Sequence, residues 1–240
     1  MMQTAAMRGD GGELSDWEHF VTDVPWLLQG GRQAVAGEPA PADAGLIDVD
    51  RFPKLVRLVA AATATPVAID GEDRVLLTWR TGSGDRLSWL CLPPTEGGST
   101  IHPDHRALLR GFGGIVECGG DDRGSWLLNC NDALTAREAE HDASFISYAD
   151  WMLEDDGGTW PIVLEDYYSI CREANGNDTL CHRRDGDVLM FAADHAFDHL
   201  EVLDGCPPYS LYRIVGAPRF VDWVEEVATQ WLAMLTPLSR

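Results

Sequence analysis

The stretch that decides the fold is residues 167–191, with the sequence YYSICREANGNDTLCHRRDGDVLMF. Two dipeptides typical of hairpin turns, Asn175-Gly176 and Asp185-Gly186, bracket residues 179–182. Asn-Gly and Asp-Gly accept the positive φ angles of tight turns, so they join antiparallel strands. The stretch therefore predicts neighbouring antiparallel strands that end in a strand at residues 188–191.

Further strands are predicted on the N-terminal side of this stretch. Residues 67–69, 75–79 and 87–92 are rich in apolar residues and are separated by the turns Asp70-Gly71 and Gly82-Ser83-Gly84. Strand-forming runs at this spacing predict a three-strand meander. Short strands are also expected at residues 115–116 and 126–128.

Helices are predicted around these strands. One starts at Pro103 and stops at Gly111, and a second is expected over residues 133–141. The last follows Pro218, where seven apolar residues form one helical stripe (Phe220, Trp223, Val224, Val227, Trp231, Leu232 and Leu235). Because parallel βαβ alternation is absent, the order of elements predicts an α+β fold with a twisted, largely antiparallel sheet flanked by helices.

The first 65 residues differ from the rest in composition and in the pattern of their residues. Ser15 and Glu18 have the spacing of a capping box, Asp50 is expected to cap a second helix, and Pro and Gly are dense at residues 37–45. We therefore expect an N-terminal helical extension with a Pro/Gly-rich linker over residues 1–65. An α+β domain is expected over residues 66–240.

Charge is the most unusual property of the chain. Its 18 basic residues face 39 acidic ones, a net charge of −21, and Lys54 is the only lysine. This balance argues against direct binding of nucleic acid or anionic lipid, both of which need clustered Lys and Arg. The chain has no apolar run of about 18 residues and no secretory signal, so we expect a cytoplasmic protein whose six cysteines are reduced.

The acidic residues gather in one region. Residues 117–166 hold 13 acids against Arg123 and Arg137, whereas residues 67–116 are close to neutral. Acidic surfaces with aromatic neighbours attract Arg-rich partners, although a solvated face would have the same composition. The candidate partner-binding residues are Asp121, Asp122, Trp151, Glu154, Asp155 and Asp156.

Signals of catalysis are weak. The run Gly111-Phe112-Gly113-Gly114 follows a helix and does not match a nucleotide-binding loop, and no nucleophile elbow is present. His195 and His199 could ligate a metal from one face of a helix, but Ala196 replaces the glutamate of the hydrolase motif. A metal-dependent hydrolase thus stays an alternative. No catalytic residue and no cofactor are predicted.

Several ordered motifs between residues 101 and 235 resemble the SUKH superfamily of immunity proteins that accompany bacterial polymorphic toxins. A helix runs into Gly113-Gly114, the turns at Asn175-Gly176 and Asp185-Gly186 follow, and an amphipathic helix closes the chain. The resemblance implies that these glycines and turns are structural. It also implies an α+β fold without a catalytic centre.

The same resemblance implies a function in binding a cognate toxin, often a nuclease or a nucleic-acid deaminase. A surface dense in carboxylates could occupy the basic groove with which such a toxin holds phosphate. A scaffold or regulatory module with a non-toxin partner is an alternative that the sequence leaves open.

Overall fold

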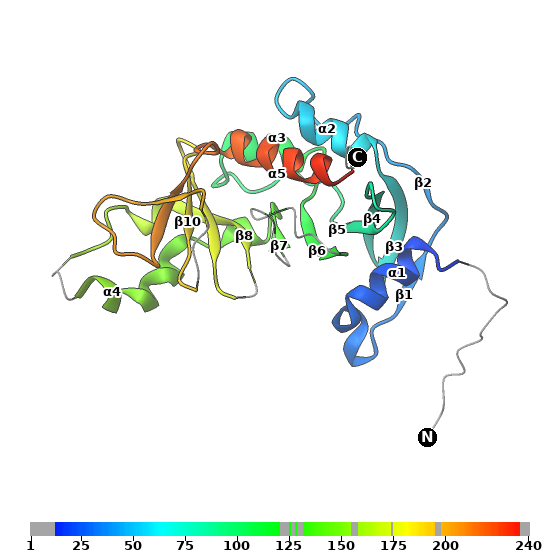
Figure 1. The fold of residues 1–240 in the computed structure, drawn as a ribbon, viewed down its shortest axis with the longest axis horizontal. Coiled ribbons are helices and arrows are strands. Elements are labelled where there is room, and N and C mark those ends of the chain that lie inside the picture. The colour runs from blue at the N-terminus through cyan, green and yellow to red at the C-terminus, as the bar shows by residue number, and fades with distance from the viewer. Residues whose placement is uncertain are drawn as a thin grey trace.

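The computed structural model describes residues 13–120, 125, 128, 132–154, 158–173, 175–194 and 198–235 (Figure 1). Its strands form a 12-stranded sheet in the order β1-β3-β4-β5-β6-β7-β8-β9-β10-β12-β11, with β2 also paired to β3. The described strand pairs are antiparallel. The fold is α+β, with a largely antiparallel sheet flanked by helices, as the sequence predicts.

The strands are β1 (Ala34–Ala36), β2 (Ala40–Pro41), β3 (Thr63–Ile69), β4 (Glu72–Arg80), β5 (Arg86–Cys91), β6 (Ile115–Gly119), β7 (Asp132–Ala133), β8 (Tyr167–Arg172), β9 (Asp178–His182), β10 (Val188–Phe191), β11 (Leu200–Val202) and β12 (Leu211–Ile214). The helices are α1 (Asp16–Asp23), α2 (Pro53–Ala60), α3 (Pro103–Leu109), α4 (Trp151–Glu154) and α5 (Phe220–Leu235). Short 3₁₀ segments are η1 (Pro25–Gly31), η2 (Glu138–Glu140), η3 (Ala143–Ala149) and η4 (Leu164–Asp166).

The two predicted hairpins and the predicted meander are present. β8, β9 and β10 pair in sequence order, and the turns between them place Gly176 at φ 93° and Gly186 at φ 72°. β3, β4 and β5 pair in the same way, through a turn in which Asp70 and Gly71 both have positive φ. The turn dipeptides therefore set the strand order in both halves of the sheet.

The N-terminal residues add strands to the same sheet. α1 begins directly after Ser15. The side chains of Ser15 and Glu18 form the predicted capping box. β1 then pairs with β3 at the Ala34–Ile69 position, and β2 falls within the expected linker. The expected boundary between residues 65 and 66 lies inside β3.

One face of the sheet is covered by α2, α3 and α5, which lie together along the top of Figure 1. Alternate side chains of a strand point to opposite faces. Trp79 and Trp89 accordingly meet Trp231 of α5, with ring centroids 5.6 and 4.7 Å apart, whereas Leu76 and Leu90 point away from it. The main core therefore lies between α5 and the sheet.

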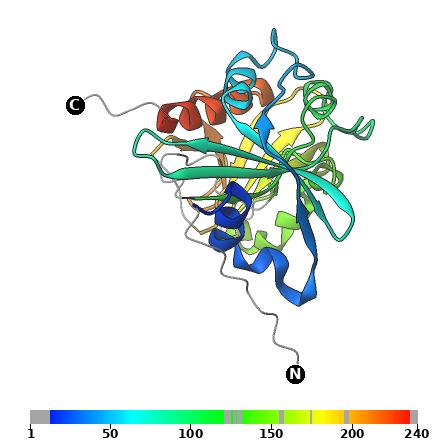
Figure 2. The ribbon, with the colours of Figure 1, turned by 90° about the vertical axis from the view of Figure 1, so that its right-hand side faces the viewer.

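Two smaller cores cover the ends of the opposite face. Phe20 of α1 packs on one end, and Ile146 of η3 packs on the other, beneath β8–β10. Figure 2 shows α2 and α5 above the strands and α1 below them. In Figure 1, β6 and β7 lie between these two smaller cores, and no described helix lies beneath the two strands.

One predicted helix and one predicted helix cap are wrong. Residues 133–141 form the end of β7, a turn and η2, because Leu134 has a left-handed φ of 60°, which a helix does not accept. The carbonyl of Leu134 instead hydrogen-bonds to the imidazole of His105. The N-cap position of α2 is held by Phe52, which makes no side-chain hydrogen bond to the helix. Asp50 lies two residues further upstream and therefore does not cap α2.

The glycine pair after α3 sits where backbones approach closely. A Cβ on Gly113 would collide with the carbonyl oxygen of Pro93, and a Cβ on Gly114, at φ 92°, would lie 2.6 Å from the backbone of Leu134. Only glycine lets β6 start at this distance from its neighbours. This contact places β6 in the middle of the sheet.

We predict that Gly113→Ala lowers the free energy of unfolding by about 3 kcal/mol, because two backbones must separate to admit the methyl group. Gly98→Ala is the matched control, since its nearest atom would be the Thr100 hydroxyl at 3.8 Å. Urea unfolding measures both variants. Equal stability of the two would contradict the close packing around Gly113.

Candidate functional site

The central strands carry a row of carboxylates on the face opposite α5. Glu117 of β6 pairs with Leu90 of β5, so their side chains lie on the same face of the sheet. Asp178 and Leu180 are alternate residues of β9 and also share a face. Leu90 and Leu180 belong to the two smaller cores on the face opposite α5. Asp132 of β7 pairs in register with Arg172 of β8, which pairs with Asp178. We call Glu117, Asp132, Glu138 and Asp178 the central carboxylate row.

Arg172 holds part of this row together. Its Nε donates to Asp178 Oδ2 at 3.0 Å, and its Nη2 lies 2.9 Å from Glu138 Oε1, an ion pair without hydrogen-bond alignment. The guanidinium also lies over the ring of Phe145, 5.1 Å from its centroid. One arginine thus connects β9, η2 and η3.

Burial raises the pKa of three carboxylates of the row, Glu117, Asp132 and Asp178. Desolvation raises the pKa of Glu117, although the Trp26 indole and a backbone N–H stabilise its charge, and the nearby Asp132 charge raises it further. Desolvation also raises the pKa of Asp132 against the opposing effect of Arg137. Asp178, 1% exposed, has a pKa raised by burial to about 7, despite hydrogen bonds from Ser169 and Arg172. These carboxylates are therefore costly to keep charged.

Exposed aromatic side chains lie at the two ends of this face. Tyr148 of η3 and Trp151 of α4 are 61% and 64% exposed. At the other end Trp26 of η1 is 51% exposed and donates from Nε1 to Glu117 Oε2 at 2.8 Å. Figure 1 places α4 and η1 at opposite ends of the lower side, with β6 and β7 between them.

The predicted partner-binding residues are only partly described. Trp151 lies on the surface at the start of α4, and Glu154 ends that helix. Asp121, Asp122, Asp155 and Asp156 lie outside the described residues, as does the Glu154 side chain. Asp150 supports the same segment, because its carboxylate accepts a hydrogen bond from Trp160 Nε1 at 2.6 Å.

The candidate metal ligands are also split. His199 is exposed in the turn before β11, and its carbonyl accepts a hydrogen bond from Val215. His195 lies outside the described residues. In the part of the chain that is described, no three His, Cys, Asp or Glu side chains are grouped to hold a metal.

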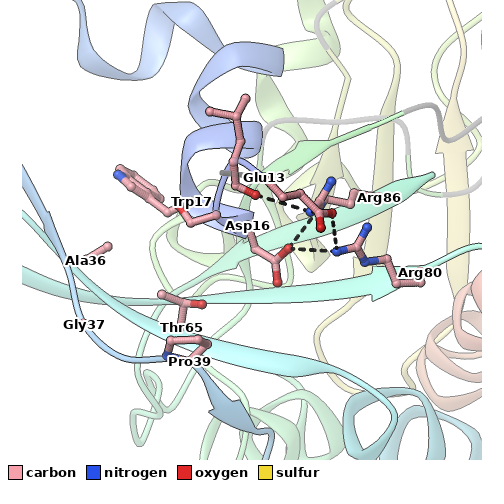
Figure 3. Close-up of a pocket in the computed structure, with 11 residues that line it drawn as sticks. Glu13, Asp16, Trp17, Ala36, Gly37, Pro39, Thr65, Arg80 and Arg86 are labelled. Carbon is pink, nitrogen blue, oxygen red and sulfur yellow. Dashed lines mark hydrogen bonds and ion pairs between the residues drawn. The ribbon is translucent and has the colours of Figure 1, made fainter. Parts of the chain in front are cut away.

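A cavity of about 300 Å³ opens between α1, β1 and the strands β3–β5 (Figure 3). Arg86 at its edge donates to Asp16 at 2.9 Å and Glu13 at 2.8 Å, and its Nη1 lies 2.7 Å from His19 Nε2, which must accept. Arg80 lies 3.4 Å from Glu13. The cavity's own carboxylates neutralise its arginines, so this network fastens α1 to the sheet.

Sequence reasoning missed Arg172, Asp178 and the Arg86 network. Only the capping box at Ser15 pointed to the start of α1. Arginine and aspartate in an alternating strand look like surface residues until the folded sheet brings η2 and η3 over them. These contacts join residues from distant parts of the chain.

No family model, curated protein or solved structure matches this chain. The resemblance to the SUKH superfamily therefore stays a prediction. No helix of the described residues is long and apolar enough to cross a membrane.

We predict that stability conferred by Asp178 falls as the pH rises from about 4 to 7. The folded state holds the Asp178 proton up to about pH 7, whereas the unfolded carboxyl releases it near its ordinary pKa of 3.8. The difference in unfolding free energy between wild type and Asp178→Asn should therefore decrease with pH, by up to about 1.4 kcal/mol per unit.

Chemical unfolding at pH 4.5 to 8 measures this difference. Ser169→Ala removes a hydrogen bond to the Asp178 carboxylate, so it should move the decrease to higher pH. Parallel pH curves for wild type and Asp178→Asn would contradict the assignment.

We predict that Arg86→Met releases α1 from the sheet. The methionine keeps an apolar stem but loses the bonds to Glu13, Asp16 and His19, so the α1 amides should exchange with solvent about tenfold faster. Arg80→Met, which removes only longer contacts, should leave the exchange unchanged. Hydrogen exchange measured by mass spectrometry separates the two, and the same rate in both would refute the fastening role.

Proposed function

We propose that this protein is a non-catalytic, immunity-type binding protein that neutralises a basic toxin or effector through an acidic face. The observation that carries the proposal is the exposed pair Tyr148 and Trp151 at the surface of the chain's most acidic segment. Large aromatic side chains are enriched where proteins bind one another, and their exposure costs free energy until a partner covers them.

The chemistry of this face suits an arginine-rich partner. Guanidinium groups stack on aromatic rings and pair with carboxylates, and the segment offers both kinds of group. Trp26 with Glu117 presents the same combination at the other end of the face. The net charge of −21 would steer such a partner toward the protein before contact.

The raised pKa values of Glu117 and Asp132 support the same reading. Glu117 and Asp132 are partly desolvated, so a cationic side chain placed near them would stabilise charges that are costly without it. Inhibition would follow when the acidic face covers the basic groove that a nuclease or deaminase uses for its own substrate. The same contacts could serve a regulatory module with a non-toxin partner.

We predict that the Tyr148→Ala, Trp151→Ala double variant folds normally but loses its partner. Immobilised wild type, incubated with lysate of its own source, should retain a basic protein that a salt gradient releases. The double variant should retain at least about tenfold less of it. Stoichiometric wild type should inhibit the nuclease or deaminase activity of the captured protein.

Val35→Ala is the matched control, since Val35 is also exposed but lies on β1 at the edge of the sheet. Equal retention by the double variant and wild type would refute the aromatic anchors. A captured protein whose activity is unaffected would favour the regulatory module. Reversal of Glu154, Asp155 and Asp156 to lysine should slow association without unfolding the protein, and salt-independent binding would contradict the charge argument.

A further inference from the structure

A cavity of about 420 Å³ lies where the start of α3 meets the turn between β9 and β10. Its lining includes Arg106, Arg183 and Arg184, together with Thr100, His182 and Asp166. In Figure 1, α3 lies on the upper side of the molecule and α4 on the lower, so the cavity is separate from the proposed acidic face.

The three arginines stand out because cations are scarce in this chain and the others are mostly paired. Nine arginines lie within 4.0 Å of a carboxylate (Arg32, Arg51, Arg74, Arg80, Arg86, Arg137, Arg172, Arg213 and Arg219). Among the described residues, no carboxylate lies within that distance of Arg106, Arg183 or Arg184. Within the described part of the chain their charges therefore have no acidic partner, although the protein has an excess of acids.

Arg183 is held in place by uncharged groups. Its Nε donates to the carbonyl of Glu165 at 3.2 Å and its Nη1 to the carbonyl of Thr100 at 3.1 Å. The guanidinium also lies over the ring of Tyr168, 5.1 Å from its centroid. These contacts orient the side chain without neutralising it, and they use only part of its five N–H donors.

Arg106 adds an unused donor. Its Nε is sealed from solvent and has no acceptor in the described part of the chain. Arg106 also lines the cavity, so its positive charge adds to that of Arg183. Arg184 is exposed at the turn and completes the group of three.

We propose that this cavity binds a small phosphate monoester. Guanidinium groups match the oxygens of a phosphate through paired N–H···O bonds, and the Thr100 hydroxyl can donate as well. Among the lining residues, three arginines against Asp166 leave an excess of two positive charges, which suits the nearly divalent charge of a phosphate monoester at neutral pH. A volume of about 420 Å³ leaves room for a small organic group beside the phosphate.

Calorimetric titration of the full chain tests the proposal with glycerol 3-phosphate, inorganic phosphate, glycerol and tricarballylate at matched ionic strength. Glycerol 3-phosphate should bind, inorganic phosphate should bind more weakly, and glycerol should not bind. Absence of phosphate binding, or a preference for tricarballylate, would overturn the proposal. Equal affinities for glycerol 3-phosphate and inorganic phosphate would overturn the proposal of a monoester ligand and would indicate a site for the free anion.

Arg184→Gln should weaken binding of glycerol 3-phosphate at least about fivefold, and Arg183→Gln with Arg184→Gln at least about twentyfold. Arg57→Gln with Arg110→Gln is the matched control, because both side chains are exposed, remove the same charge and lie outside the cavity lining. Equal losses in the control would refute the site. Because Arg183 also bonds backbone carbonyls, Arg184→Gln alone decides the outcome if the double variant fails to fold.

This inference is independent of the proposed acidic face. The Tyr148→Ala, Trp151→Ala variant should bind glycerol 3-phosphate as wild type does, and the arginine variants should retain the basic protein partner. A failure of either site would therefore leave the other untouched.

Discussion

The contact of three indole rings holds α5 against the sheet, and the remaining packing follows from it. Trp79 and Trp89 come from neighbouring strands, and their ring centroids lie 4.9 Å apart. Trp231 of α5 packs edge-on against both rings. Trp79 donates to the carbonyl of Leu58, which ties α2 into the same cluster. The Nε1 atoms of Trp89 and Trp231 have no acceptor among the described residues, so apolar burial and ring geometry supply the stabilisation.

With α5 fixed on one face, the opposite face is divided. α1 packs on the meander and η3 packs on the C-terminal hairpins, each with its own small core. The strands between them carry acids in place of a third apolar core, and Arg172 connects them to η2 and η3. The two candidate binding regions thus lie on different parts of the molecule and use charges of opposite sign.

Local signals in the sequence predicted much of the fold. Asn175-Gly176 and Asp185-Gly186 specify hairpins by their backbone preferences alone, and the stripe of α5 specifies a helix by its period. The expected helix over residues 133–141 failed because Leu134 is forced into a left-handed conformation beside Gly114, a contact between distant parts of the chain. β1 and β2 were missed because they are short and mostly exposed, with no alternating pattern.

The candidate sites were less accessible to such reasoning. The exposure of Trp151 agrees with its place in an acidic segment, which composition alone could suggest. The arginine cavity could not be predicted, because Arg106 and Arg183 come together only when α3 packs beside the β9–β10 turn. Its distinguishing property is that no carboxylate of the described residues lies within 4.0 Å of these arginines, and that property exists only in the folded chain.

The long separation in sequence between Trp231 and its two partner indoles has a consequence for synthesis. Trp79 and Trp89 precede Trp231 by 152 and 142 residues, so a ribosome makes both of them well before their partner. Until α5 leaves the exit tunnel, no helix packs on the two indole rings of the meander. The rings then form an exposed apolar surface that promotes aggregation. The nascent chain is thus a natural substrate for chaperones, and a message truncated before α5 yields a protein prone to aggregation.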